Sequence, residues 1–142
     1  MRGTPARVEE RVEGLLKEQL TKIVSETWSI QENIGHLADL EPLWLGRLDD
    51  LLSGASELRE ADLTNAATHN ANHNSKPIAE IIGTFRELRQ TFVARLDKLS
   101  EVEVLLAALH PRLKRPMRTI DLVYFVAEHD DHHLAQMTKL LL

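Results

Sequence analysis

The chain contains no cysteine, and this absence removes three kinds of chemistry. Without a thiol side chain there can be no disulfide, no zinc site built on thiolates and no cysteine nucleophile. Catalysis, if the protein is an enzyme, must therefore come from histidine, carboxylate or hydroxyl side chains, or from a bound cofactor.

An excess of positive charge is also absent, since 17 Lys and Arg residues stand against 22 Asp and Glu residues. The 142 residues carry a formal net charge of −5 at neutral pH, whereas a nucleic-acid-binding protein normally shows a basic face. We therefore expect no nucleic-acid partner.

Long apolar runs are missing as well. No stretch approaches the roughly 18 residues that a membrane span requires, and the first residues lead directly into charged sequence. We expect a soluble, cytoplasmic protein without a membrane partner. The length suits one domain, residues 1–142, which is large enough to bury a core without disulfides.

Apolar residues recur at helical spacing in four long segments. These predict helices from Pro5 to about Val24, from Ile30 to Leu52, from about Pro77 to Leu99, and from Thr119 to Leu142. Ser29 and Glu32 form a capping-box pattern at the start of the second helix. A short helical turn is expected at residues 102–109.

No segment shows the alternation that predicts a strand, so the expected fold class is all-α, a four-helix bundle. The link between the second and third helices, about residues 55–75, is long enough to run back along the bundle, whereas the other links are short or compact. We therefore predict an up-down-down-up bundle with a long crossover between helices two and three.

Two histidines of the last helix provide the first chemical signal. His129 and His133 are four residues apart, so their imidazoles project from one helix face, about 5–6 Å apart at Cβ. They fall in the apolar row of that helix, where two unpaired imidazoles would be costly. One metal ion could bind both, but hydrogen bonds to backbone or carboxylate groups could satisfy them equally well.

A metal held by this pair would need a third protein ligand, because catalytic sites usually have three and leave one position open. His36 is the candidate. In the predicted topology the second and last helices are antiparallel, and His36 then lies near the level of His133.

Two familiar metal motifs are absent. Di-iron bundles need two Glu-x-x-His pairs and many zinc proteases carry His-Glu-x-x-His, and the sequence contains neither.

Two motifs in order along the chain resemble the DinB/YfiT-like superfamily. They are Gly-His-Leu-Ala-Asp-Leu-Glu at residues 35–41, preceded by Trp-Ser-Ile at 28–30, and His-Asp-Asp-His-His-Leu-Ala-Gln at 129–136. The resemblance covers essentially the whole chain. It implies an up-down-down-up bundle in which His36, His129 and His133 bind a divalent metal.

The same resemblance bears on function. It implies a metal-dependent transferase or hydrolase in which the metal activates a thiol or water. Characterised members include thiol-dependent S-transferases and isomerases that use bacillithiol, mycothiol or glutathione, so a thiol-dependent S-transferase is the leading expectation, although many members have no assigned reaction. Three neutral imidazoles suit zinc, nickel or iron. The partner would then be a small-molecule substrate or thiol. The alternative, from another class, is a non-catalytic, stress-associated metal-binding protein.

The crossover from Asn65 to Asn74 is rich in asparagine and histidine. We expect it to reach the end of the bundle that holds the site and to form one wall of a cavity there, with Asn72 and His73 as candidate substrate or cofactor contacts. Gln136, one turn after His133, is a third candidate. A plain surface loop is the alternative reading.

Some polar residues have other expected roles. Glu41 lies in an apolar row and is expected to pair with an arginine such as Arg86, or else to face the metal. The basic segment Arg112 to Arg118 is expected at the opposite end from the site, exposed to solvent.

Two residues next to the histidine pair are expected to be peripheral. His132 lies on another helix face and is expected in solvent. Asp130 could orient an imidazole, but a solvated or hydrogen-bonded carboxylate is the simpler expectation.

A homodimer is expected from the resemblance and from Leu43 and Leu45, apolar residues that flank the row of the second helix.

Overall fold

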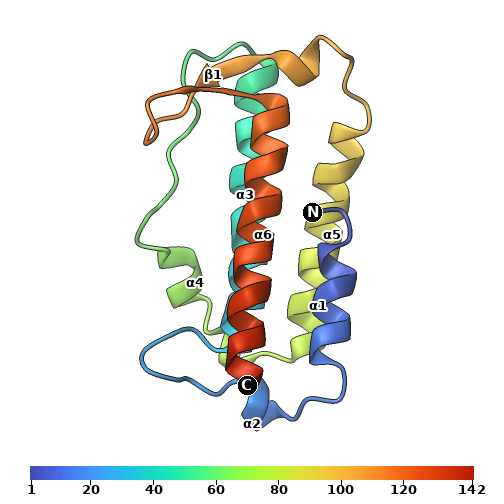
Figure 1. Ribbon diagram of the computed structural model, residues 1–142, viewed down its shortest axis with the longest axis vertical. Coiled ribbons are helices and arrows are strands. Elements are labelled where there is room, and N and C mark those ends of the chain that lie inside the picture. Colours follow the sequence, from blue (N-terminus) through green and yellow to red (C-terminus); the bar gives the residue numbers. More distant parts are fainter.

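The computed structural model describes all residues, 1–142, and its architecture is a four-helix bundle (Figure 1). The long helices are α1 (Thr4–Val12), α3 (Ile30–Leu52), α5 (Ile78–Leu96) and α6 (Thr119–Leu141). Figure 1 shows α3 and α5 running in one direction and α1 and α6 in the other, so the chain order is up-down-down-up, as predicted. No helix is both long enough and apolar enough to cross a membrane.

Helix α3, the second of the four predicted helices, begins where its capping-box pattern predicts. The Ser29 hydroxyl accepts a hydrogen bond from the Glu32 backbone N–H at 3.1 Å, and the Glu32 carboxylate accepts one from the Ser29 N–H at 2.8 Å. This reciprocal pair satisfies two N–H groups that a helix start leaves free, and it fixes the register of α3.

The first helix is shorter than predicted. It ends at Val12, and a separate short helix, α2 (Lys17–Leu20), follows. Gly14 between them has a φ of +76°, a left-handed conformation that interrupts a helix and that glycine adopts without strain. The continuous helix to Val24 was therefore a wrong prediction.

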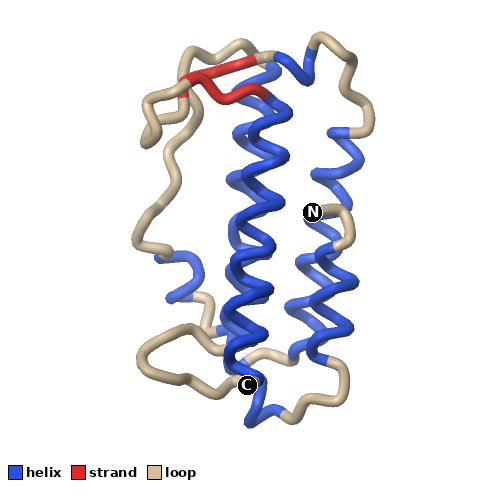
Figure 2. The backbone as a smooth tube through the Cα atoms, viewed as in Figure 1, coloured by secondary structure: helices blue, strands red, loops and turns tan.

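The prediction that the chain forms no strand was also wrong. After the 3₁₀ turn η2 (Glu103–Leu105), β1 (Ala107–Leu109) pairs antiparallel with β2 (Pro116–Arg118), opposing Ala108 to Met117. Figure 2 shows this hairpin lying across one end of the bundle. Strands of three residues are too short to display an alternating pattern.

The long crossover between α3 and α5 carries α4 (Ala66–Asn70) and the 3₁₀ turn η1 (His73–Ser75). It is tied to the hairpin, because the backbone N–H of Leu109 donates to the Ser56 carbonyl and that of Leu58 donates to the Leu109 carbonyl, both at 2.9 Å. Figure 1 shows it running along the outside of the bundle beside α3.

The core consists of two hydrophobic clusters separated by a polar layer. On α3 the clusters use residues 30–38 and 44–51, and on α6 they use 134–137 and 122–126. Glu41, Arg89 and Asp130 lie between them, and each is at most 2% exposed. Leu43 and Leu45 are half-buried and pack against the second cluster, so the homodimer prediction rests on the resemblance alone.

The polar layer corrects the expected partner of Glu41. Arg89, not Arg86, donates to the Glu41 carboxylate, at 2.6 and 3.0 Å, and to Asp130 at 2.5 and 3.0 Å. Arg86 instead pairs with Glu9 near the surface. The expectation of a buried ion pair is confirmed and its named partner was wrong, because residues 86 and 89 are three apart and lie on the same side of a helix.

Candidate metal centre

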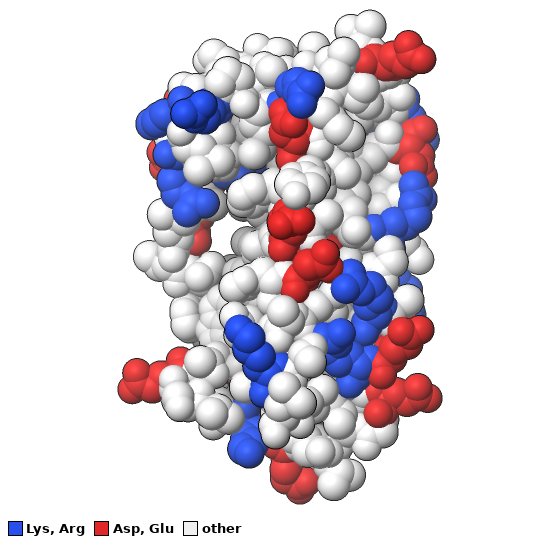
Figure 3. All heavy atoms as spheres, viewed as in Figure 1, with Lys and Arg blue, Asp and Glu red and all other residues white.

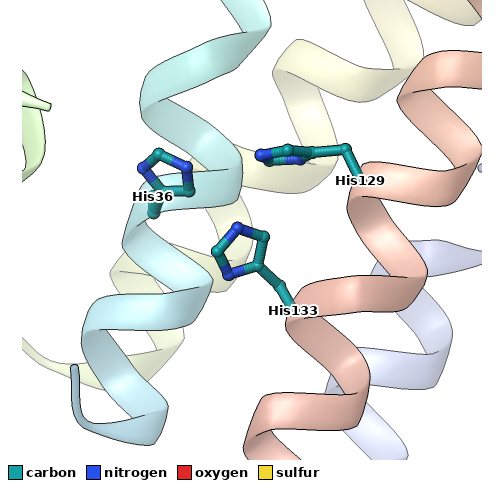
Figure 4. A group of neighbouring side chains, drawn as sticks. All are labelled: His36, His129 and His133. Atoms are coloured by element: carbon teal, nitrogen blue, oxygen red, sulfur yellow. The ribbon is translucent and has the colours of Figure 1, made fainter. Parts of the chain in front are cut away.

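His36 from α3 and His129 and His133 from α6 come together in the interior (Figure 4). One ring nitrogen from each lies within 4.8 Å of the others. The ring centroids are 4.6 to 5.3 Å apart, and Figure 4 shows the three side chains pointing toward a common centre. The structure therefore brings together the three histidines predicted as ligands.

The protonation of His36 is set by a hydrogen-bond chain. Thr68 Oγ1 lies 3.0 Å from His36 Nδ1 and 2.8 Å from Asp39 Oδ2. A hydroxyl has one proton and a carboxylate can only accept, so Thr68 donates to Asp39 and accepts from His36. Nδ1 of His36 thus carries the proton, and Nε2 keeps its lone pair for a ligand role.

Asp39 is in turn held by the crossover. His73 Nε2 lies 2.8 Å from the same Asp39 oxygen. The His73 ring packs directly against Gly35, where a Cβ atom would overlap it. The glycine before the predicted ligand therefore gives the ring the space it needs to reach Asp39.

His133 is oriented by an amide. Asn33 Nδ2 donates to the carbonyls of Trp28, at 3.2 Å, and Ser29, at 2.8 Å, which leaves Asn33 Oδ1 to face His133 Nδ1 at 2.8 Å. An amide oxygen only accepts, so His133 also carries its proton on Nδ1 and presents an unprotonated Nε2. Hydrogen bonds of this kind commonly orient metal-binding histidines.

His129 is the member of the cluster without such a partner. Its Nδ1 is buried and makes no hydrogen bond. The edge of Trp44 lies beside the ring, with centroids 5.5 Å apart. An unpaired buried nitrogen is costly, and a cation bound through Nδ1 of His129 would remove that cost. Three convergent imidazoles with one orphaned nitrogen fit a divalent metal ion.

Burial keeps the three imidazoles neutral. It lowers the pKa of His36 and of His129 to about 4, and that of His133 to about 2, with the neighbouring histidines adding to the shift at His36 and His133. Metal ions bind the neutral form, so the site is ready for a cation at neutral pH without first losing protons.

A cavity of about 440 Å³ opens beside the cluster, and all three histidines line it. Trp44 and Phe125 contribute apolar wall, and Asn65 contributes from the crossover. His132, exposed as expected, also reaches its rim. Three protein ligands beside an open cavity resemble catalytic rather than structural metal sites, which close all positions with protein groups.

The three other predicted contact residues lie elsewhere. Asn72 is exposed and His73 is buried against Gly35, and neither lines the cavity. Gln136 lines a separate hollow on the other side of His133. Of the segment from Asn65 to Asn74, only Asn65 lines the cavity. Thr68 does not line it but contacts His36 from behind, a contact that the sequence did not reveal.

The basic residues between Arg112 and Arg118 are exposed, as expected, but one of them lies nearer the site than predicted. Arg112 lines the same cavity as the three histidines. The β1–β2 connection, residues 110–115, folds down over the side of the bundle, which brings Arg112 toward the site although the hairpin crosses the far end (Figure 1). Helix positions alone could not reveal this fold-back.

Asp130 neighbours His129 in sequence but turns away from the cluster. It is 1% exposed, accepts from Arg89 and accepts a 2.6 Å hydrogen bond from the Thr4 hydroxyl. Its role is to anchor α6 to α1 and α5, so the hydrogen-bonded expectation is confirmed and the solvated one is wrong.

Comparison with solved structures finds the same architecture in YfiT from Bacillus subtilis. The TM-score is 0.86, the sequence identity is 21%, and the match covers 98% of this chain and 80% of that one. YfiT is described as a probable metal-dependent hydrolase with an unusual four-helix bundle topology, and at this identity the likeness establishes a shared fold.

Comparison of the sequence with known proteins and protein families assigns the chain to a family. No curated protein matches the chain. The sequence profile of the DinB superfamily, however, matches residues 1–137. Because that match spans nearly the whole chain, the protein belongs to the DinB superfamily.

Proposed function

We propose that the protein is a metal-dependent enzyme in which His36, His129 and His133 hold one divalent ion at the wall of the cavity. The observation that supports this most strongly is the convergence of three neutral imidazoles, with Nε2 of His36 and His133 left unprotonated by their hydrogen bonds. Imidazole ligands suit zinc, nickel or iron.

A divalent ion at this position would act as a Lewis acid and lower the pKa of a water or thiol that binds beside it. The protein orients the imidazole rings and keeps bulk water away from them. Thr68 and Asn33 hold two of the rings in place. Trp28, 4.5 Å from the His36 ring, and Trp44 shield the cluster from bulk water.

The favoured reaction is S-transfer from a small-molecule thiol. A sulfur–carbon bond forms, the bond from that carbon to its leaving group breaks, and the thiol proton passes to solvent. The chain has no cysteine, so the sulfur must come from the substrate.

The cavity wall supports a reaction that needs no carboxylate base. Its two carboxylates, Glu60 and Asp62, are both exposed. Asp62 already accepts hydrogen bonds from Thr64 and from the Ala66 N–H. A thiol activated by a metal reacts without a separate base, because the thiolate itself is the nucleophile.

Hydrolysis is the second candidate, and the description of YfiT as a probable metal-dependent hydrolase favours it. The same three histidines and cavity could hold a water in place of a thiol. The non-catalytic alternative, a stress-associated metal-binding protein, uses the histidines only to stiffen the bundle.

The deciding experiment begins with metal analysis of the purified protein. Metal-loaded protein is then given a low-molecular-weight thiol with an alkylating electrophile, or a panel of esters and amides without thiol. S-conjugate formation that depends on metal supports the transferase, and hydrolysis without thiol supports the hydrolase. Loss of fold on chelation, with neither reaction and no thiol binding, supports the non-catalytic role.

A matched pair of variants tests the ligand set. His129→Ala should strongly reduce bound metal while leaving helix content largely intact. His132→Ala, on the same helix but exposed, should retain the metal. Near-stoichiometric metal in the His129→Ala protein would contradict the assignment.

A further inference from the structure

Arg47 is a buried cation without a direct ion-pair partner. Its side chain on α3 is 2% exposed, and no carboxylate lies within ion-pair distance of it. The other buried arginine, Arg89, has two carboxylate partners. Buried charges are normally paired, so an unpaired guanidinium indicates that its partner comes from outside the chain.

The protein gives the Arg47 guanidinium only one clear acceptor. Its Nε donates to the backbone carbonyl of Arg59 at 3.2 Å. Its Nη1 lies 3.3 Å from His110 Nε2, and Nη2 makes no hydrogen bond to the protein. A guanidinium has five N–H groups, so most of its donor capacity is unused.

His110 does not make up this deficit. Its Nδ1 accepts hydrogen bonds from the backbone N–H groups of Arg112 and Leu113, both at 3.2 Å. Burial and the nearby arginines lower the pKa of His110, so the ring is neutral and, with Nδ1 accepting, carries its proton on Nε2. The 3.3 Å contact with Arg47 therefore brings two donors together, and both need an acceptor.

These donors face the cavity that holds the histidine cluster. Arg47 and His110 both line it, as does Arg112, an exposed arginine without an ion-pair partner. Figure 3 shows Lys and Arg side chains gathered over the β1–β2 connection, at upper left, above a recess in the surface. Of the acidic lining residues, Asp62 is occupied by its own loop and Glu60 is exposed.

Trp44 connects the two ends of the cavity. Its ring lies 5.5 Å from the His129 ring and 5.9 Å from the Arg47 guanidinium carbon. Leu40 and Phe125 extend this apolar wall. A ligand that reaches from the cluster to Arg47 would lie along the indole.

We infer that Arg47 and His110 form an anion-binding subsite, which receives a carboxylate or phosphate of the small-molecule substrate while the reacting group lies at the histidine cluster. The placing of that reacting group rests on the proposed function. The guanidinium edge of Arg47 matches two oxygens of such an anion, and His110 Nε2–H donates to one of them. The substrate is thus an elongated organic anion with an apolar middle.

The test uses probes that separate the two ends. Protein loaded with cobalt(II) is titrated with ω-mercaptocarboxylic acids of increasing length and with the neutral mercaptoalcohols of the same lengths. Thiolate binding to the metal is followed by its charge-transfer absorption. At one chain length the acid should bind at least about tenfold more tightly than the alcohol, as expected for a charge-assisted hydrogen bond in a buried site.

Variants assign that preference to a residue. Arg47→Gln should bring the acid-to-alcohol affinity ratio close to one by weakening binding of the acid more than binding of the alcohol. Arg95→Gln, which removes an arginine paired with Asp49 at the surface, should leave the ratio as it was. Because the acid and the alcohol are compared first in the unmodified protein, the result does not depend on the Arg47 variant folding.

Failure of the inference and failure of the proposed function give different results. If thiols bind the metal but acids and alcohols bind equally at every length, the subsite is overturned and the metal site stands. If no thiol binds, the proposed function fails, and the subsite is judged on metal-free protein by the ¹⁵N NMR signal of the Arg47 side chain. Inorganic phosphate or acetate should shift that signal, and an unchanged signal at saturating anion would overturn the subsite.

Discussion

The amide oxygen of Asn33 lies 2.8 Å from Nδ1 of His133, a residue 100 positions later in the chain, across the interface of α3 and α6. The contact sets the orientation of one predicted ligand from the first turn of the opposite helix. Removing this contact should therefore lower metal affinity more than it lowers the stability of the fold.

Replacing Asn33 with Ala should lower metal affinity by about 10- to 100-fold, the usual effect of losing a hydrogen bond behind a metal-binding histidine. Asn33→Asp keeps an acceptor for Nδ1 and should lose less. Competition with a chromogenic chelator measures the affinity, and Gln90→Ala, an exposed change on α5, serves as control. Equal affinity in the Ala and wild-type proteins would contradict the orienting role.

Thr68 is expected to act on His36 in the same way from the crossover. Thr68→Val keeps the shape of the side chain but removes the hydroxyl, which leaves the His36 Nδ1–H without an acceptor. Metal affinity should fall by about tenfold or more, and Thr68→Ser should restore it. If the Ser and Val variants bind metal alike, the hydroxyl has no part in the site.

Arg89 is expected to be the most sensitive position of the polar layer. Arg89→Met leaves Glu41 and Asp130 buried without their cation and should lower the free energy of unfolding by about 3–5 kcal/mol. Arg86→Met removes only the half-exposed pair with Glu9 and should cost about 1 kcal/mol or less. Urea unfolding of both variants measures the difference, and similar losses would refute the distinction.

The metal-free protein should lose stability as the pH falls below about 6.5. The pKa of each cluster histidine in the unfolded chain is about 6.5, whereas in the folded protein it is about 4 for His36 and His129 and about 2 for His133. Between these values the unfolded chain binds protons that the folded protein does not, so acid favours unfolding.

The measurement is urea unfolding of chelator-treated protein between about pH 7.5 and 5.5, above the range in which most carboxylates titrate. His129→Leu should reduce the pH slope, and His132→Ala should not. A stability that is flat across this range would show that the histidines are not held neutral by burial.

Helical periodicity was sufficient to predict α3, α5 and α6 and the face shared by His129 and His133, but it did not predict that α1 ends at Val12. It could not reveal Asn33 or Thr68 as partners, because their contacts cross between segments far apart in the chain. The exposed state of Asn72 and the burial of His73 depend on how the crossover folds, which composition does not determine.

The errors have similar causes. Arg86 and Arg89 share a helix side, and only packing decides which of them is buried. Arg112 reaches the cavity because a hairpin of two three-residue strands turns its connection back over the bundle, and such strands leave no periodic signal. The surroundings of Arg47 were missed for the same reason, because the hairpin places His110, and no carboxylate, beside its guanidinium.

The packing of the His73 ring against Gly35 limits how this site could change. A methyl group at residue 35 would push the ring off Asp39 and loosen the chain of hydrogen bonds that ends at His36, although residue 35 offers no atom to a ligand. Selection for a different metal or substrate could therefore alter the cavity wall freely, while Gly35 stays fixed. Gly35→Ala would leave all three metal ligands in place and still disrupt the site.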